Sequence, residues 1–308
     1  MLRTDPIVHR LTQGEWVDGL AQATPALPFA APHWTRWGGL SAPERRFTPA
    51  LLRSPQGDLL VPLFQSGLDG QLGGFGYGMV CPTESWRGGV VAPFDAFAAV
   101  LCAANGLSGL RTLLPPVGMV PELDRLTGHW TGEPGRPTYV LDLTGGTERV
   151  WAKARGSVRT AVRRAEQHGV HVADAWPADA AQLRKLYRTT LGRNGHALAG
   201  GGPDLTFLVA GGSDVLTVAA RGRDDTVHAV AAFGVAAGVG YHVLQVTSPA
   251  GRDTNAGHLA FLAGLDRLAA SGVRTVDLGS ATSAGQARFK QNWGAVERLT
   301  RLLSWRSR

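Results

Sequence analysis

The sequence has few lysines, few cysteines and no long apolar run. Only two cysteines are present, Cys81 and Cys102, and their spacing fits neither a zinc site nor a disulfide framework. We therefore expect two reduced, buried thiols, as in a cytoplasmic protein. The longest apolar run, 229–240, is shorter than a membrane span and is interrupted by glycine, so no integral membrane segment is predicted. The N-terminus also lacks the apolar core of a signal peptide.

Several catalytic signatures are absent as well. No glycine precedes a lysine, which excludes the phosphate-binding loop that ends in Gly-Lys-Ser/Thr. Neither G-x-S-x-G nor H-E-x-x-H occurs, and the glycines of 73–78 do not have the dinucleotide-binding spacing. His168 and His171 have no third ligand near them in the sequence. No metal site is predicted.

The composition is that of an ordinary globular protein with an uneven charge distribution. The chain has 308 residues, 44% hydrophobic and 18% charged, which suits two domains of ordinary size. Residues 1–130 contain 9 basic and 10 acidic residues, which leaves 31 − 9 = 22 basic and 24 − 10 = 14 acidic residues in 131–308. The surplus of positive charge in the second part predicts an anionic partner there: nucleic acid, a nucleotide-linked substrate or coenzyme A.

Hydrophobic alternation and turn residues predict the same order of elements in both halves. In the first half we expect a three-strand meander, a helix and a further strand at 50–54, 59–65, 71–79, 94–105 and 110–114. In the second half the corresponding elements are expected at 214–220, 226–233, 240–247, 256–270 and 275–278. This repeated order predicts an α/β (α+β) protein with two mixed-sheet domains, 1–130 and 131–308, joined near the Gly/Pro-rich stretch 128–137.

Two arginine-rich helices are predicted in the second domain. The first, 147–168, is capped by Thr147 and has Arg159 and Arg163 along one flank of an apolar stripe. A second basic helix, 183–192, is followed by Arg193. Unpaired like charges four residues apart destabilise a helix slightly. Both a solvated face and a face that contacts phosphates are consistent with this pattern.

The stretch 275–294 has the strongest functional signal. A strand ends in Asp277-Leu-Gly279, small residues follow, and a short helix, 285–292, presents Phe289 and Lys290. The chain has 31 basic residues, of which only Lys153, Lys185 and Lys290 are lysines. In such a chain a lysine indicates that a compact ammonium is needed at that position, although a solvent-exposed lysine is the simpler alternative.

This stretch resembles the Fem-type (FemABX) transferases and their relatives in the GNAT-like acyltransferase superfamily. The resemblance rests on Asp277-x-Gly279 followed by Phe289-Lys290-x-x-Trp293-Gly, and on the arginine pattern of 147–168. It implies two tandem GNAT-like acyltransferase domains and transfer of an aminoacyl or acyl group to an amine. It further implies that Lys290 lies near the reacting carbonyl, that Phe289 shapes the pocket, and that Asp277 is a hydrogen-bond acceptor or a base.

The loop before helix 256–270 bears on the donor. Coenzyme A-dependent GNAT acetyltransferases carry Gln/Arg-x-x-Gly-x-Gly/Ala at this point, and its backbone holds a pyrophosphate at the helix N-terminus. Here Arg252 and Gly257 fit the pattern, but Asn255 replaces the first glycine. Asn255 tolerates a left-handed conformation, yet its side chain adds bulk where the phosphate would approach. Asn255 as a simple N-cap is the alternative.

The preceding strand supplies two further candidates. Strict alternation places Tyr241 and Gln245 on one face of strand 240–247 and His242 on the other. Tyr241 and Gln245 are therefore predicted substrate contacts, together with Arg159, Arg163, Arg193, Arg252, Asn255 and Gly257.

Three functions remain open from the sequence. The preferred one is an aminoacyltransferase that moves an amino acid from aminoacyl-tRNA to an amine of a peptidoglycan precursor peptide or related acceptor, with no cofactor. The second is an N-acyltransferase that uses acyl-coenzyme A. The third, a non-catalytic RNA-binding protein, explains the charge but gives the Asp-x-Gly and Phe-Lys elements no role.

Overall fold

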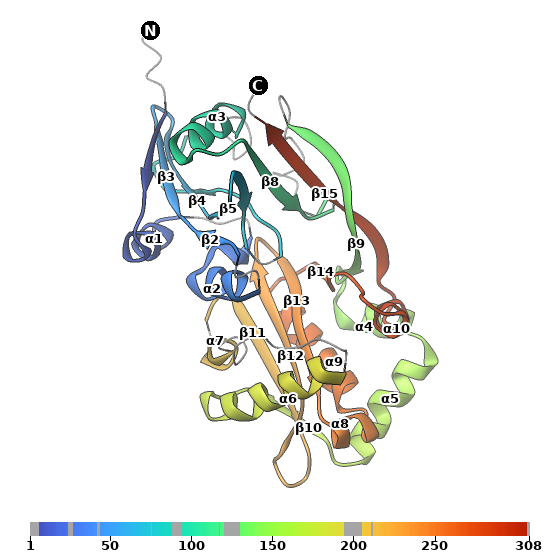
Figure 1. The fold of residues 1–308 in the computed structure, drawn as a ribbon. Helices are drawn as coiled ribbons and strands as arrows, with labels where there is room; N and C mark the ends of the chain where they lie inside the picture. Colours follow the sequence, from blue (N-terminus) through green and yellow to red (C-terminus); the bar gives the residue numbers. More distant parts are fainter. Residues whose placement is uncertain are drawn as a thin grey trace. The chain divides into compact units, whose positions relative to one another are not determined.

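The computed structural model (Figure 1) describes residues 6–23, 27–41, 44–74, 76–87, 94–116, 118–119, 130–193, 205–210 and 212–306. The chain packs as two units. Unit 1 consists of Met1–Arg136 and Leu299–Arg308, and unit 2 consists of Pro137–Arg298. The boundary between Arg136 and Pro137 lies within the Gly/Pro-rich stretch 128–137, of which residues 128 and 129 lie outside the described residues. The last ten residues belong to unit 1.

Unit 1 contains two sheets. The first is antiparallel and has the order β1 (Ile7–Arg10), β3 (Ala50–Ser54), β4 (Gly57–Val61), β7 (Cys81–Pro82). The second has the order β9 (Thr131–Asp142), β15 (Val296–Arg306), β8 (Gly109–Leu114), β6 (Asp69–Leu72), β5 (Leu63–Ser66), β2 (Arg46–Phe47). The predicted meander over 50–79 is therefore wrong as a single sheet. Pro62 has no N–H for a ladder, so the expected strand 59–65 breaks there and its two parts join different sheets.

The helices of unit 1 pack on these sheets through large aromatic side chains. They are α1 (Gln13–Leu20), α2 (Pro32–Ser41) and α3 (Phe94–Asn105), and the bounds of α3 are those predicted. Trp16 of α1 and Trp34 of α2 are fully buried. Cys81 and Cys102 are free, buried thiols.

Unit 2 is built on one mixed sheet. Its order is β10 (His171–Asp174), β11 (Val215–Arg221), β12 (Val227–Ala236), β13 (Val239–Thr247), β14 (Thr275–Asp277) and the second part of β9. The β13–β14 pairing is parallel, and the other neighbouring pairs are antiparallel. The strands and the helix predicted for the second half are thus present with small shifts at their ends.

Helices cover both faces of this sheet. They are α4 (Gly146–Lys153), α5 (Gly156–Gln167), α6 (Ala180–Arg193), α7 (Thr206–Ala210), α8 (Pro249–Asp253), α9 (Ala256–Ala270) and α10 (Ala284–Asn292). In Figure 1, α9 lies behind β11–β13 and α6 lies in front of them. No helix among the described residues is long and apolar enough to cross a membrane.

The single basic helix predicted over 147–168 is instead two helices, α4 and α5. Ala154 and Arg155 between them have extended backbone, with ψ of 143° and 150°. The break is held by one tertiary and one local hydrogen bond: Arg155 N donates to Asn292 O of α10 at 2.9 Å, and the Arg159 guanidinium donates to Ala154 O. Thr147 does not cap the helix, because its hydroxyl donates to Asp266 and Gly145 holds the N-cap position.

Candidate active site

The site lies where the parallel pair β13–β14 ends. Asp277, the last residue of β14, pairs in register with Tyr241 and is only 3% exposed. Asp277 Oδ1 accepts hydrogen bonds from the Thr138 hydroxyl and from Gly279 N, the latter at 2.8 Å. Gly279 has a φ of +72°, which favours glycine. Asp277 therefore fixes the turn by which the chain leaves the sheet and enters the small-residue loop.

Lys290 of α10 reaches into this loop. Its Nζ donates to Gly279 O and to Ser280 O, both at 2.7 Å, and lies 5.6 Å from the centre of the Tyr139 ring. The residue is 7% exposed. Burial lowers the pKa of the Lys290 ammonium to about 8, and the nearby Asp277 carboxylate opposes this shift. A solvent-exposed lysine is therefore excluded.

His242 lies near Lys290. Strict alternation predicted His242 and Gln245 on opposite faces of the strand, but the structure places them on the same face. The β12–β13 register shifts between Ala232 and Phe233, so β13 carries an extra residue between His242 and Leu244. His242 Nε2 consequently lies 3.2 Å from Gln245 Oε1, on the same side of the strand, and Tyr241 is on the opposite side. Residues 241–247 contain no glycine or proline that would indicate a bulge after His242.

The environment of His242 keeps its imidazole neutral. The ring packs against Phe233 and Phe261, with centroid distances of 5.1 and 5.2 Å. Burial, followed by the charge of Lys290, lowers the pKa of His242 to about 3. Gln245 Nε2 in turn donates to Gly257 O at 3.1 Å. A hydrogen-bonded chain thus joins the β13 bulge to the first turn of α9.

Phe289 packs into an aromatic cluster between α9 and α10. Its ring centroid lies 5.2 Å from that of His258, 5.3 Å from that of Phe261 and 6.4 Å from that of Trp293. Trp293 is fully buried. Phe289 thereby fixes α10 against α9 and sets the position from which Lys290 extends.

The α8–α9 turn has the left-handed geometry considered for Asn255. Asn255 has φ 60° and ψ 23°. It occupies the N-cap position of α9, as the alternative predicted, but its side chain makes no capping hydrogen bond. A Cβ on Gly257 would lie 2.9 Å from Thr247 Oγ1. This close packing explains why a glycine occupies the position. Arg252 is exposed, and its Nη1 donates to Thr247 O at 3.2 Å.

The three predicted phosphate-contacting arginines have different surroundings. Arg159 is half-buried and braces the end of α4, whereas Arg163 on α5 and Arg193 at the end of α6 are exposed. The α4–α5 break bonds to Asn292, two residues after Lys290, so Arg155 and Arg159 lie at the helix end that carries the ammonium. The structure thus brings this basic segment close to Lys290.

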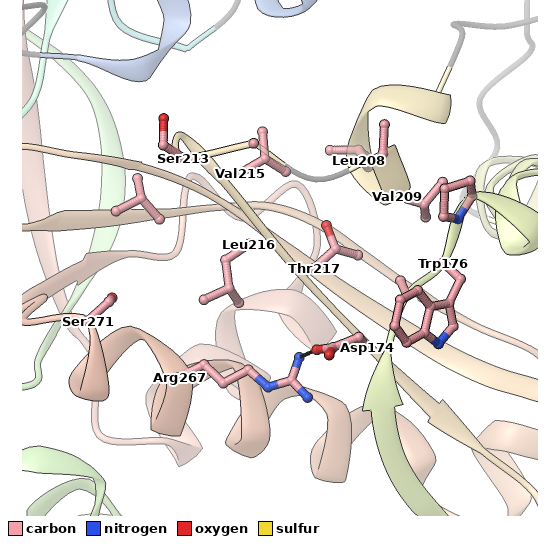
Figure 2. A pocket seen from close by; sticks show the side chains of 15 residues that line it. Asp174, Trp176, Leu208, Val209, Ser213, Val215, Leu216, Thr217, Arg267 and Ser271 are labelled. Atoms are coloured by element: carbon pink, nitrogen blue, oxygen red, sulfur yellow. Dashed lines mark hydrogen bonds and ion pairs between the residues drawn. The ribbon is translucent and has the colours of Figure 1, made fainter.

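A groove in unit 2 lies elsewhere. It has a volume of about 700 Å³, lies against the first residues of β11 and contains none of the predicted site residues (Figure 2). Among the described residues, no group of three or more His, Cys, Asp or Glu side chains is placed to hold a metal ion.

Comparison with known proteins identifies the fold. Residues 152–291 match the family model described as an acetyltransferase (GNAT) domain. This part of the chain is similar to GNAT acetyltransferase domains. The match includes β10–β14, the α8–α9 turn and Lys290, and it supports an acyltransferase. No curated protein matches the sequence.

Solved structures extend the similarity over both units. A crystal structure of FemX superposes with a TM-score of 0.67 at 12% identity, over 98% of this chain and 97% of that one. The C-terminal domain of a putative lysylphosphatidylglycerol synthetase from Agrobacterium fabrum gives 0.61 at 11%, over 95% and 92%. L-PGS from Bacillus licheniformis gives 0.61 at 13%, over 97% and 94%. The predicted α/β class and the Fem-like arrangement of GNAT-like domains are confirmed as a fold.

Proposed function

We propose that this acyltransferase moves an amino acid from aminoacyl-tRNA to an amine of a peptidoglycan precursor peptide or a related acceptor. The observation that carries the proposal is the buried Lys290 ammonium, held by two carbonyl groups of the small-residue loop inside a fold similar to that of FemX. One of the similar structures is also named as a putative lysylphosphatidylglycerol synthetase. Such a name is consistent with an aminoacyl donor in proteins of this fold.

The chemistry follows from the position of Lys290. The acceptor amine attacks the ester carbonyl of the donor, and the carbonyl oxygen becomes an oxyanion. An ammonium has three N–H donors, and the Gly279 and Ser280 carbonyls engage two of them. The third stabilises the oxyanion in a buried site, where a fixed charge acts strongly because little solvent screens it. With a pKa of about 8, Lys290 remains mainly charged near neutral pH.

Asp277 has a structural part in this proposal. Its Oδ1 already accepts hydrogen bonds from Thr138 and Gly279, so the carboxylate orders the backbone that holds Lys290. The Asp277 carboxylate also raises the pKa of the Lys290 ammonium. In this proposal Asp277 therefore supports the reaction through the loop and through Lys290, and it does not take a proton from the acceptor amine.

The basic segment supports a polyphosphate donor. Ten basic residues and three acidic ones lie between Arg149 and Arg193. Arg155 N contacts Asn292 O at 2.9 Å, so the α4–α5 break adjoins the end of α10. A tRNA backbone along α5 would place its 3′ end toward the Lys290 cluster, and Arg163, exposed one turn beyond Arg159, is available to contact phosphate.

The α8–α9 turn favours aminoacyl-tRNA over acyl-coenzyme A as donor. In the coenzyme A-dependent pattern a glycine stands where Asn255 lies, because the pyrophosphate approaches the backbone closely there. Asn255 keeps the left-handed geometry but adds a side chain to the turn. We therefore expect acetyl-coenzyme A to be a poor donor.

The test offers both donors to the same protein. Purified enzyme and a muramyl pentapeptide precursor are incubated with labelled aminoacyl-tRNA or with acetyl-coenzyme A, and the mass of the acceptor is followed. Aminoacylation that is lost in Lys290→Met supports the proposal. Acetylation without aminoacylation would assign the donor to coenzyme A instead.

A salt titration tests the tRNA surface separately. Binding of a tRNA mixture should weaken steeply with salt, because each neutralised phosphate releases counterions. Arg163→Ala should reduce both affinity and salt dependence, while the exposed Arg111 of unit 1 provides a matched control. Equal loss in Arg163→Ala and Arg111→Ala would show that only net charge is involved.

A further inference from the structure

Strand β9 supplies three consecutive residues to the candidate active site. The Thr138 hydroxyl donates to Asp277, and Val140 pairs in register with the same residue. Tyr139 O accepts a hydrogen bond from Leu278 N at 2.8 Å. None of these β9 residues lies in the stretch that matches the acetyltransferase family model. β9 therefore borders the site without any role that the family match or the sequence motifs assign to it.

The side chain of Tyr139 lies beside the Lys290 ammonium. Nζ of Lys290 is over the aromatic ring, 5.6 Å from its centre, which is within the ~6 Å range of cation–π contacts. Tyr139 is 5% exposed and Lys290 is 7% exposed, so little solvent screens the contact. The face of an aromatic ring is negative and attracts a cation, most strongly when both groups are desolvated. The ring therefore stabilises the ammonium form of Lys290.

A hydrogen bond to the neighbouring strand fixes this ring. The Tyr139 hydroxyl donates to Glu297 Oε2 at 2.8 Å. Glu297 is an exposed residue of β15, which flanks β9 on the side away from β14. The hydrogen bond to Glu297 raises the pKa of the Tyr139 phenol, so the phenol stays protonated and remains a donor. The ring is thus anchored at its hydroxyl and faces the ammonium.

We propose that Tyr139, anchored by Glu297, is a positioning residue that holds the Lys290 ammonium charged and in place for the developing oxyanion. This inference rests on the proposed function of Lys290. The Gly279 and Ser280 carbonyls fix the ammonium through two hydrogen bonds, and the ring restricts its movement on a further side. In this arrangement Tyr139 acts on the reaction only through Lys290.

Several charged and titratable groups surround Lys290 and its Asp277 partner. They are Asp277 of β14, His242 and Tyr241 of β13, Tyr139 of β9, Glu297 of β15, His258 of α9 and Arg155 at the α4–α5 break. Burial lowers the pKa of Lys290 to about 8, and the Asp277 carboxylate opposes this shift. The Tyr139 ring acts in the same direction as Asp277. Removing the ring should therefore lower the pKa of Lys290 further.

The titration of Lys290 is measurable without any donor, because the chain has only three lysines. The full chain is labelled with a trace of acetic anhydride over a range of pH values, and the labelled peptides are quantified by mass spectrometry. Lys153 and Lys185 are exposed and provide internal references. Tyr139→Leu should lower the pH midpoint of Lys290 labelling by about 0.5–1.5 pH units, since it removes the cation–π attraction and keeps an apolar side chain. Tyr139→Phe retains the ring and should leave the midpoint near that of wild type.

Turnover of the same variants separates the ring from its anchor. Tyr139→Leu should lower turnover about tenfold and leave donor binding unchanged, because a displaced ammonium stabilises the oxyanion poorly. Tyr139→Phe and Glu297→Ala keep the ring but release it, so each should lower turnover about two- to fivefold. Glu297→Gln still accepts the hydrogen bond and should be close to wild type.

Tyr187→Leu is the matched control, because it removes a half-buried tyrosine of α6 in the same unit. It should change neither the labelling midpoint of Lys290 nor turnover. Circular dichroism checks that every variant is folded. Glu297→Ala keeps the proposal testable if Tyr139→Leu does not fold, since Glu297 is exposed.

The inference is wrong if Tyr139→Leu leaves the Lys290 midpoint unchanged or raises it, or if Glu297→Ala has wild-type turnover. It is also wrong if Tyr187→Leu reproduces the effects of Tyr139→Leu. A wild-type protein without transfer activity, together with the expected midpoint shift, would refute the proposed function and leave the effect of Tyr139 on Lys290 confirmed. Turnover that depends on Lys290 but not on Tyr139 would refute only this inference.

Discussion

Replacing Lys290 with methionine tests the centre of the proposed mechanism. The change removes the ammonium and keeps a side chain of similar length. If Lys290 stabilises the oxyanion, turnover should fall roughly 10²–10³-fold, about 2.7–4 kcal/mol of transition-state stabilisation. Donor binding should be retained, because the charge matters most in the transition state.

The effect of Lys290→Met on stability is the balance of two opposing terms. The Gly279 and Ser280 carbonyls lose their ammonium donor, at a cost of about 1–3 kcal/mol for each carbonyl left buried and unpaired. In compensation, the folded state no longer holds a charge whose pKa is lowered from 10.5 to about 8. Such a shift corresponds to roughly 3 kcal/mol. We expect a net change smaller than either term, and a folded variant.

The pH dependence gives this prediction its sharpest test. Lys290 loses its charge as the pH rises through about 8, so turnover should fall there. Lys290→Arg stays charged throughout but fits poorly as a planar guanidinium. The ratio of wild-type to Lys290→Arg turnover cancels the titration of the acceptor amine and should decline above pH 8.

The stability of the same proteins should change with pH in the opposite direction. The unfolded chain binds more protons than the folded one between pH 8 and 10.5, so unfolding free energy rises with pH in this window for wild type relative to Lys290→Met. Chemical denaturation at several pH values measures this. A Met variant with near wild-type turnover, or a flat turnover ratio, would refute the assignment of Lys290.

Three further changes separate structural from catalytic roles. Arg159→Ala should lower the unfolding free energy by about 1 kcal/mol in denaturant titrations, because it braces the end of α4, and Arg163→Ala should not. Gly257→Ala should destabilise by about 1–3 kcal/mol, because its Cβ would meet Thr247 Oγ1 at 2.9 Å. Asp277→Asn should retain most turnover but move the alkaline loss of activity to lower pH, since the carboxylate raises the pKa of Lys290. A turnover loss as large as that of Lys290→Met would instead make Asp277 a base.

Hydrophobic periodicity and turn residues correctly predicted the helices and strands whose formation depends on nearby residues. Helices 94–105 and 256–270 have the predicted bounds, and the strand–loop–helix order around Asp277 and Lys290 is as expected. The sequence did not predict that these two residues lie close enough for the Asp277 carboxylate to raise the pKa of Lys290. Their chemical roles stay predictions.

The features that the sequence did not reveal depend on distant contacts. The break between α4 and α5 is held by Asn292, more than a hundred residues later, and by a guanidinium inside the helix that was expected to continue. The bulge in β13, which appears in its register with β12, places His242 and Gln245 on the same face of the strand. Periodicity within one segment contains no information about either contact.

The last strand has a consequence for how the protein forms. Residues 301–306 of β15 pair with residues 109–114 of β8 inside unit 1. During synthesis, the second sheet of unit 1 must therefore wait for residues made after the whole of unit 2. Contacts of such long sequence separation close slowly. Unit 2, whose pairs lie within one continuous segment, is able to fold first, and the order of folding is then the reverse of the order of the units along the chain.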